Sequence, residues 1–374
     1  MRMLLVYAIS LFCMSCVSCN KSHDEKGDDK KAETGDYFEY SNPQQFTGID
    51  NGRMLRDPCI VKEGDTYYLT GTSWPNFENY GELPGTSIYA SEDLKNWRHV
   101  CDPVRRPSKE GPEWWKCNFW APEIFVHNGK YYYTVNTSRT YLTDEGGMEN
   151  EVALFVADKI EGPYKPITKE HSVTVGNDAH IFCDTDGKTY MFVSGVYGFE
   201  VDLETGTPIG EKFLCVSPTA DQGKWTSVHA TGFEGPYVVL RDGIYYLFFS
   251  AWARGYEIGY ATATNIRGPW TMHPSPIYGS MNKATCDRLG TNYEPDYYVN
   301  DFAESGHNTI FKGPDGRDWI VAHVFAEPFT GAYLDNKLGM AFDPIEFDNG
   351  QIKIMDGTKS VNGPTKGTKR IKLK

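Results

Sequence analysis

Five segments of this chain share one layout, and this repetition limits the folds open to the chain more than any other feature. Each segment begins with a short strand-like run, continues through a polar turn with glycine, and ends in a run rich in aromatic residues. The segments are DPCIVKEGDTYYLTGTS from Asp57, APEIFVHNGKYYYTVNTS from Ala121, DAHIFCDTDGKTYMFVSG from Asp178, EGPYVVLRDGIYYLFFSA from Glu234 and HNTIFKGPDGRDWIVAHV from His307. Such a repeat predicts a fold built from copies of one supersecondary unit.

Each segment is predicted to form a β-hairpin, because β-branched and aromatic residues flank an Asn-Gly, Asp-Gly or similar turn. Runs typical of a third strand follow three hairpins, from Ser87, Ala153 and Ile258, and no long helical pattern is convincing. The segments begin 56 to 73 residues apart, which exceeds the roughly 40 to 50 residues of common propeller repeats and indicates longer loops. The sequence therefore predicts an all-β, five-bladed β-propeller, with a linear β-solenoid as the alternative.

The residues that open the five segments are expected to meet, because the first strand of each propeller blade lines the central channel. Three of these residues are acidic: Asp57, Asp178 and Glu234. Gathering three carboxylates costs free energy through repulsion and desolvation, which a purely structural role would not favour. Each acid taken singly also suits a turn. Together, at matching repeat positions, they indicate a catalytic site.

Glycoside hydrolysis is a reaction that needs such a group of carboxyls. One protonates the leaving oxygen, and another activates water or attacks the sugar. A third carboxylate near the acid helps to keep that acid protonated near neutral pH. Aromatic residues make up 14% of the chain, with 24 tyrosines and 9 tryptophans, which agrees with sugar binding because sugar faces stack well on such rings.

Short motifs in a fixed order resemble those of glycoside hydrolase family 43. They are RDP at 56–58, WAPEI at 120–124, ND at 177–178, EGP at 234–236 and GHN at 306–308, and the similarity extends from about residue 50 to about residue 350. The resemblance implies an inverting mechanism. It makes Asp57 the general base, Asp178 the residue that tunes the acid and orients the substrate, and Glu234 the general acid, with no cofactor required.

Further site residues follow from the same resemblance. His307 is similar to a family histidine near the propeller axis that often contacts calcium or its waters, so a structural or electrostatic calcium at the centre is one expectation and a buried core histidine is the other. Arg254 follows the hairpin of the acid, where family members often place a substrate-binding arginine. Trp120, Trp74 and Trp252 are candidates for stacking on the sugar, although propellers also bury tryptophans between blades.

The N-terminus predicts export. Arg2 precedes an apolar run that is typical of a secretory signal and short for a membrane span. The sequence CVSC at 16–19 resembles the end of a bacterial lipoprotein signal, which implies that residues 1–18 are cleaved and that Cys19 is lipidated. Lipidation at Cys16 and a plain secretory signal are the alternatives.

Residues 19–36 are then expected to be the lipidated cysteine and a disordered tether, because their polar and charged side chains cannot bury apolar area. Residues 37–374 are expected to form a single catalytic propeller. The expected location is a bacterial cell envelope, with membrane contact only through the lipid anchor. Among the later cysteines, Cys101 and Cys117 could form a disulfide bridge.

The net charge of −13 argues against nucleic-acid binding, because phosphate neutralisation needs basic clusters. The expected partner is instead an oligo- or polysaccharide of the arabinose- or xylose-containing plant type, bound by a monomer. An α-L-arabinofuranosidase or arabinanase is favoured, because little sequence after His307 is left for the extra β-sandwich that many xylosidases carry. A β-xylosidase, a galactan-active enzyme and a non-catalytic carbohydrate-binding surface lipoprotein are the alternatives.

Overall fold

The computed structural model shows an all-strand protein in the part of the chain that it describes. The described residues are 35–44, 48–49, 54–74, 84–140, 149–217, 233–251, 256–274, 276–278, 302–325, 338–356, 359–361 and 365–373. They contain β-strands and no α-helix, so no helix among them is long and apolar enough to cross a membrane. The compact unit that holds the strands is Asp36–Lys374.

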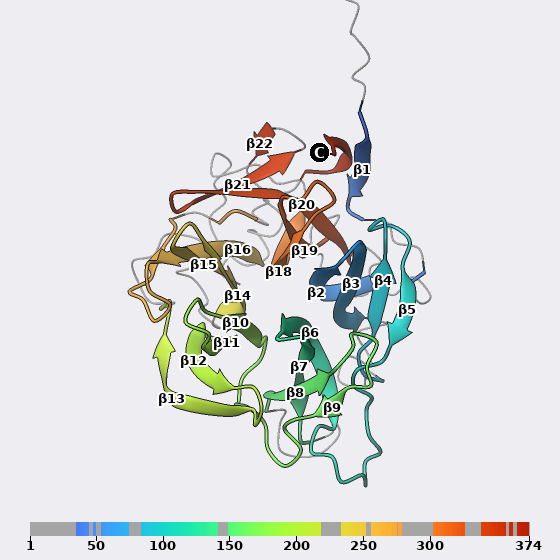
Figure 1. Cartoon of the computed structure of the whole chain (residues 1–374), viewed down its shortest axis with the longest axis vertical. Helices are drawn as coiled ribbons and strands as arrows, with labels where there is room; N and C mark the ends of the chain where they lie inside the picture. The colour runs from blue at the N-terminus through green and yellow to red at the C-terminus, as the bar shows by residue number, and fades with distance from the viewer. Residues whose placement is uncertain are drawn as a thin grey trace, which may run out of the picture. The chain divides into compact units, whose positions relative to one another are not determined.

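Five sheets surround a common centre, each forming one blade (Figure 1). Blade 1 contains β2 (Met54–Glu63), β3 (Thr66–Trp74), β4 (Ile88–Ser91) and β5 (Arg98–Cys101), and blade 2 contains β6 (Cys117–His127), β7 (Lys130–Ser138), β8 (Glu151–Ala157) and β9 (Lys165–Pro166). Blade 3 contains β10 (His180–Cys183), β11 (Thr189–Val193), β12 (Tyr197–Asp202) and β13 (Thr207–Leu214).

Blades 4 and 5 complete the ring. Blade 4 contains β14 (Phe233–Arg241), β15 (Ile244–Ala251), β16 (Glu257–Ala263) and β17 (Thr271–Met272). Blade 5 contains β18 (Ala303–Lys312), β19 (Asp318–Phe325), β20 (Leu338–Asp348), β21 (Gln351–Asp356) and β22 (Lys359–Val361). Strands pair antiparallel and in chain order within every blade. The predicted five-bladed propeller is confirmed, and β4, β8 and β16 are the expected third strands.

The hairpin turns have the geometry that their sequences predict. Asn128 and Gly129 join β6 to β7 with φ of +50° and +71°, and Asp242 and Gly243 join β14 to β15 with φ of +50° and +78°. Two successive positive φ values are the mark of a type I′ turn, whose twist matches that of the flanking strands. The Asn-Gly and Asp-Gly pairs therefore set the register of these inner hairpins.

In every blade, the residue at one equivalent position near the start of the inner strand adopts a left-handed backbone conformation. These five kink residues are Asp57 (φ +52°), Ala121 (+44°), Asp178 (+57°), Gly235 (+55°) and His307 (+50°). Four of them lie at shifts in the pairing register of their strands. A left-handed conformation costs a residue with a Cβ atom roughly 1 to 2 kcal/mol, so neighbouring contacts must hold these residues in place.

The kinks correct one detail of the repeat alignment. Asp57 and Asp178 are themselves kink residues, but Glu234 precedes the kink residue Gly235 by one position. In register, Glu234 therefore corresponds to Arg56 and Trp120, which precede the kinks of blades 1 and 2. The third acid reaches the centre from a different backbone position than the other two.

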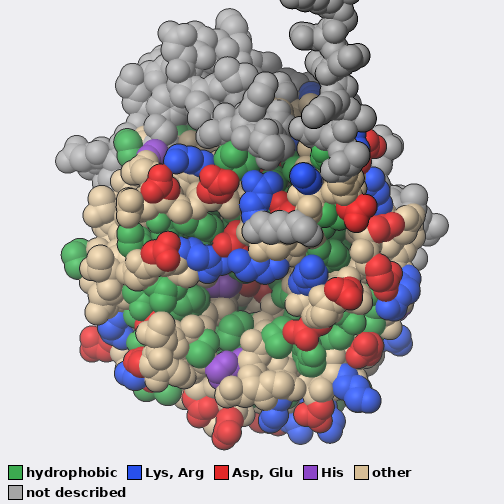
Figure 2. Space-filling model, turned by 45° about the horizontal axis from the view of Figure 1, so that its top comes forward, with side chains coloured by type: hydrophobic (Ala, Val, Ile, Leu, Met, Phe, Trp, Pro, Cys, Tyr) green, Lys and Arg blue, Asp and Glu red, His purple; other side chains and the backbone are tan. Residues whose placement is uncertain are grey.

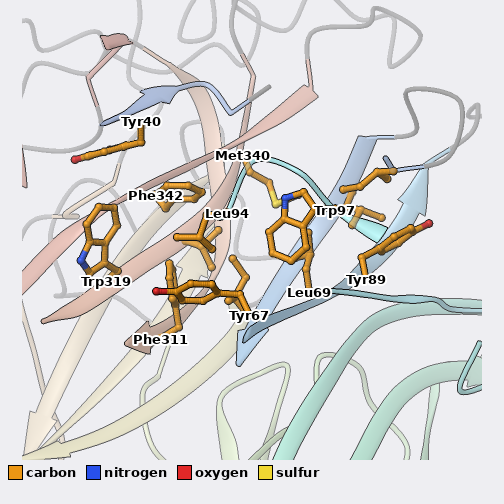
Figure 3. Packing of buried hydrophobic residues seen from close by; sticks show 14 of the residues in the cluster. Tyr40, Tyr67, Leu69, Tyr89, Leu94, Trp97, Phe311, Trp319, Met340 and Phe342 are labelled. Atoms are coloured by element: carbon orange, nitrogen blue, oxygen red, sulfur yellow. The ribbon is translucent and has the colours of Figure 1, made fainter. Parts of the chain in front are cut away.

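The hydrophobic core is divided among the blade interfaces. Five large clusters of buried residues each join two neighbouring blades. The cluster in Figure 3 closes the ring between blades 5 and 1, with contributions from β1 (Tyr37–Asn42). Its large members include Tyr40, Tyr67, Trp97, Phe311, Trp319 and Phe342. Burial of such side chains contributes about 1.5 to 3 kcal/mol each, so packing between blades is the main source of stability.

The terminal strands are joined to the ring by a fully buried carboxylate. Strand β1 pairs with β23 (Gly367–Lys372), and Asp343 on β20 accepts hydrogen bonds from both strands. Lys369 Nζ donates to Asp343 Oδ1 at 2.5 Å, Tyr40 donates to the same oxygen at 3.0 Å, and Asn42 Nδ2 donates to Oδ2 at 2.9 Å. The Asp343 side chain has 0% exposure, so its charge depends on these partners.

Asp343→Asn is expected to lower the free energy of unfolding by about 3 to 5 kcal/mol, because it leaves the buried Lys369 charge without its counterion. Urea denaturation followed by circular dichroism measures the change. Lys353→Ala is the control, because its ion pair with Asp348 is exposed and should contribute less than about 1 kcal/mol. Equal losses in the two variants would contradict this account of the buried pair.

The cysteine prediction is wrong in one respect. Cys101 and Cys117 form no disulfide with each other. The Cys101 thiol donates to the Ile160 carbonyl, and the Cys117 thiol donates to the Thr140 carbonyl. The two cysteines lie on β5 and β6, in different blades. Each thiol donates a hydrogen bond to a backbone carbonyl, and the two sulfur atoms are not bonded to each other.

Candidate active site

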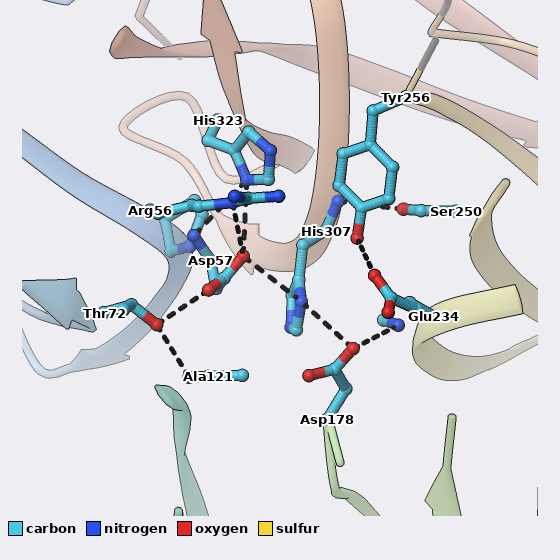
Figure 4. A network of polar contacts seen from close by, with 12 residues as sticks. Arg56, Asp57, Thr72, Ala121, Asp178, Glu234, Ser250, Tyr256, His307 and His323 are labelled. Atoms are coloured by element: carbon cyan, nitrogen blue, oxygen red, sulfur yellow. Dashed lines mark hydrogen bonds and ion pairs between the residues drawn. The ribbon is translucent and has the colours of Figure 1, made fainter. Parts of the chain in front are cut away.

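Acidic side chains from three blades converge on one histidine. Asp57 lies on β2, Asp178 precedes β10 and Glu234 lies on β14, and all three surround His307 of β18 (Figure 4). The His307 Nδ1 atom is 3.5 Å from Asp57 Oδ1 and 3.8 Å from Asp178 Oδ2. Figure 2 shows a hollow near the middle of the described surface, bordered by interspersed basic and acidic side chains. The structure thus brings together the acids that the repeat pattern singled out.

Asp57 is buried and surrounded by groups that favour its charged form. Thr72 donates to Oδ2 at 2.7 Å, and Arg56 Nε is 3.6 Å from Oδ1. Burial raises the pKa of Asp57, but the charges of His307 and Arg56 outweigh it and hold the pKa well below its usual range. Asp57 is therefore a carboxylate at any working pH, as a proton acceptor must be.

Asp178 is held by three donors. Asn136 Nδ2 donates to Oδ1 at 3.1 Å, while the Ser194 hydroxyl and the Gly235 amide donate to Oδ2 at 3.0 Å each. Since Gly235 follows Glu234 directly, the Asp178 carboxylate fixes the backbone that carries the third acid. Such a well-bonded carboxylate can orient its neighbours without moving itself.

Glu234 is partly buried and contacts a buried phenol. The Tyr256 hydroxyl donates to Glu234 Oε2 at 3.3 Å. Burial and the nearby charges of Glu234 and Asp178 raise the pKa of Tyr256 well above its usual value, so the phenol stays a donor. Its ring packs on Gly306, where an added Cβ atom would lie 1.8 Å from the ring. Only glycine leaves room for this placement of Tyr256.

A ring of polar side chains supports the five kinks. We call it the second-strand belt, because its members Thr72, Asn136, Ser194, Ser250 and His323 lie at the end of the second strand of each blade or directly after it. Kink amides donate to four of them: Ala121 to Thr72 (2.7 Å), Asp178 to Asn136 (2.9 Å), His307 to Ser250 (2.9 Å) and Asp57 to His323 (3.4 Å). Ser194 donates to the Asp178 carboxylate, which accepts the Gly235 amide. Each blade thereby holds the kink of the next.

His307 carries the positive charge that balances the acids. Burial opposes this charge, but Asp57, Asp178, Glu123 and Glu234 outweigh burial and raise the pKa of His307 above its ordinary value of 6.5. A histidine whose pKa is higher in the folded than in the unfolded state stabilises the fold below the unfolded pKa. That contribution is lost as the pH rises through the folded pKa.

The wild-type protein is therefore expected to lose stability as the pH rises above 6.5, by at most about 1.4 kcal/mol per pH unit for a single group. His307→Gln should flatten this dependence, because glutamine does not titrate. Urea denaturation at several pH values measures both proteins, and His171, which is exposed, provides the control variant His171→Gln. A wild-type curve that rises over this interval would contradict the assignment of a charged His307.

The predicted sugar-stacking residues are described only in part. Trp120 lies on β6, in register with Glu234 of blade 4, and its partly buried ring packs against the cluster between blades 1 and 2. Trp74 ends β3, and its side chain lies outside the described residues. Trp252, Arg254 and Cys19 also lie outside them. Their assignments stay predictions.

The residues near His307 do not by themselves form a calcium site. Calcium takes six to eight oxygen ligands, whereas His307 turns Nδ1 towards two carboxylates that it balances as an imidazolium. Within the described residues, no group of three or more His, Cys, Asp or Glu is arranged to hold a metal. Calcium at the centre stays a prediction, and no catalytic step depends on it.

Among the residues that contact the acids, sequence reasoning missed two with large side chains, Tyr256 and His323. Tyr256 follows the fourth hairpin without any repeat signal, and no motif drew attention to it. His323 had a signal, because it occupies the place in the fifth segment that Thr72, Asn136 and Ser250 occupy in others. Alignment of the second strands alone would have shown that one of four similar positions holds a titratable ring.

Comparison with known proteins agrees with this arrangement. The family described as glycosyl hydrolases family 43 matches residues 52–352. Xylosidase/arabinosidase 43B of Humicola insolens is 29% identical over 73% of this chain and 48% of its own length. Extracellular endo-alpha-(1->5)-L-arabinanase 1 of Bacillus subtilis (strain 168) is 26% identical over 75% of this chain and 80% of its own length.

A solved structure supports the fold. The endo-arabinase from Bacteroides thetaiotaomicron VPI-5482 superposes with a TM-score of 0.60, at 21% identity, over 82% of this chain and 100% of that one. The chain spans about half the length of the first curated relatives that it matches, at 48%, 51% and 55%. Those relatives carry different activities in their names, from xylosidase to arabinosidase.

Proposed function

Because this chain belongs to glycosyl hydrolases family 43, we propose that it hydrolyses glycosidic bonds in arabinose- or xylose-containing glycans, with inversion at the anomeric carbon. The observation that carries the proposal is the meeting of Asp57, Asp178 and Glu234 around His307. Two carboxyl groups with different tasks are what glycoside hydrolysis requires. The described site supplies one that is firmly ionised and one that is more exposed.

Asp57 acts as the general base in this proposal. Its carboxylate removes a proton from the water that attacks the anomeric carbon, and the hydrogen bond from Thr72 to Oδ2 fixes the orientation of the carboxylate. The low pKa of Asp57 keeps it ionised, while the positive charge of His307 stabilises the site against repulsion among the three acids. An inverting enzyme needs space for this water between base and acid.

Glu234 acts as the general acid and protonates the leaving oxygen. Since Tyr256 donates to Oε2, the transferable proton belongs on Oε1, and the same hydrogen bond stabilises the carboxylate that forms when the proton leaves. Asp178 acts on Glu234 through the Gly235 amide, which makes it a positioning residue. A general acid in such a site contributes roughly 10² to 10⁴ in rate.

Arabinan is the first substrate to test, because an arabinan-active relative is matched over 80% of its length, and xylan follows because xylosidases are matched too. Defined arabinan, xylan and galactan oligosaccharides are incubated with the protein, and proton NMR follows the first anomer released. The expected result is a product of inverted configuration. Retention of configuration would contradict the inverting assignment. Binding without turnover of any glycan would favour a carbohydrate-binding lipoprotein.

Lipid anchoring at Cys19 in a bacterial cell envelope is proposed separately, on the sequence of the leader alone. It would place the enzyme where polymeric glycans arrive from outside the cell. Of the leader and tether, the structure describes only residues 35 and 36. The location, the anchor and the monomeric state therefore stay predictions.

A further inference from the structure

One member of the second-strand belt differs from the rest in chemistry. Thr72, Asn136, Ser194 and Ser250 are small and do not titrate, whereas His323 carries an imidazole. His323 lies on β19 where blade 5 meets blade 1, and its side chain has 0% exposure. The member of the belt that contacts Asp57 through its backbone amide is therefore the one with an imidazole side chain.

The polar contacts of this ring are made with Asp57. Nδ1 is 3.4 Å from the Asp57 amide nitrogen and 3.4 Å from Oδ1 of the same residue. Nε2 is buried and has no hydrogen-bond partner among the described residues. A neutral imidazole nitrogen with a lone pair can accept from the amide but cannot donate to the carboxylate. The Nδ1 atom is thus the one through which His323 acts.

Packing holds the ring in one orientation. The rings of His323 and Tyr256 are stacked, with centroids 5.2 Å apart and planes 18° from parallel. Tyr256 is the same residue that donates to Glu234, and the Arg56 guanidinium lies 5.6 Å from the centre of its ring. In the view of Figure 4, His323 lies above Asp57 and Tyr256 lies above Glu234. A rotation of His323 would have to displace this stack.

The charges around His323 favour its neutral form. Burial lowers its pKa, and the charges of Arg56 and His307 act in the same direction, while the Asp57 charge acts against them. The result is a pKa of about 4. At neutral pH the ring therefore keeps the lone pair that an amide donor needs.

We propose that His323 is the positioning residue of Asp57, which it holds in its left-handed conformation by accepting the Asp57 amide at Nδ1. The kink decides where the Asp57 carboxylate points, so this contact sets the direction from which the base approaches water. The role of Asp57 as base rests on the proposed function. The hold on its backbone does not.

Substitution on β19 tests the catalytic part. His323→Ala is expected to lower kcat roughly 10- to 100-fold, with KM changed less than about twofold, because the base is misdirected while substrate contacts stay. His323→Asn should restore most of kcat, because Asn136 makes the same amide contact to the kink of blade 3. Val324→Ala is the matched control, since Val324 is a buried neighbour on the same strand that packs into another cluster.

Kinetics are compared after correction for the folded fraction, measured by circular dichroism. A His323→Ala variant as active as Val324→Ala would overturn the proposal. So would a His323→Asn variant as impaired as His323→Ala, because a lost acceptor would then not be the cause. A loss confined to KM would place His323 in substrate binding instead.

Nitrogen-15 NMR of histidine-labelled protein tests the contact without any substrate. The expected spectrum shows a neutral His323 between pH 5.5 and 8, with its proton on Nε2 and an unprotonated Nδ1 that accepts a hydrogen bond. A proton on Nδ1, or titration near pH 6.5, would overturn the proposal. If the wild-type protein hydrolyses no glycan while the expected spectrum is seen, the proposed function fails and the backbone contact stands.

Discussion

Glu234→Gln is expected to lower kcat on natural arabinan or xylan oligosaccharides roughly 10³-fold, because glutamine cannot protonate the leaving oxygen. Glutamine has nearly the shape of glutamate and can still accept the hydrogen bond from Tyr256, so KM should change little. An aryl glycoside with a good leaving group needs little protonation, and its hydrolysis should fall less than about tenfold. Initial rates on both substrate types measure the difference.

The control for this variant is Glu346→Gln on β20, where the side chain is exposed and far from the acids in the chain. It should leave both rates at the wild-type level. Equal losses on the natural and the activated substrate would show that Glu234 is not the acid. Its carboxyl would then have to act in a step whose rate does not depend on the leaving group.

Asp57→Asn is expected to abolish hydrolysis, with a loss of roughly 10⁴-fold on natural and activated substrates alike. A better leaving group cannot compensate, because attack by water needs a base whichever group departs. Asparagine keeps an oxygen for the Thr72 hydroxyl and keeps the backbone amide that His323 holds, so the fold should survive. Rates on both substrate types, with circular dichroism for folding, decide the outcome.

The two variants together assign the roles, since only the acid is rescued by a good leaving group. Rescue of Asp57→Asn rather than Glu234→Gln would reverse the assignment. His307→Gln adds a cross-check, because loss of its positive charge should weaken the forces that keep Asp57 ionised. The acid limb of the activity profile should then move to higher pH.

The blade count could be predicted because hairpin signals are local. Asn128-Gly129 and Asp242-Gly243 mark turns within a few residues, and five such hairpins require five units. The second-strand belt could not be predicted as a set of contacts, because Ser250 and His307 belong to different blades, lie 57 residues apart in the sequence and meet only in the fold. Hydrogen bonds between blades follow from closure of the ring, which no single segment encodes.

The residues of the site could be predicted where they recur at matching repeat positions, and their contacts could not. Asp57, Asp178 and His307 open aligned segments, and they share the kink position. Glu234 was found by the same alignment, although it precedes the kink position by one residue. The repeat pattern is loose enough that an offset of one residue did not hide it. Tyr256 escaped detection because its contact with Glu234 depends on the absence of a side chain at Gly306, and such mutual fits leave no pattern in the sequence.

The second-strand belt has a consequence for how this protein loses activity under heat or denaturant. Each link in it joins two blades, and the kinks that it holds include those of Asp57 and Asp178 and the one directly after Glu234, which are the three acids of the proposed function. Loosening of any one blade would therefore misalign a catalytic group that belongs to another. Loss of turnover should be an early and sensitive signal of heat or denaturant damage anywhere in the ring, well before the strands themselves separate.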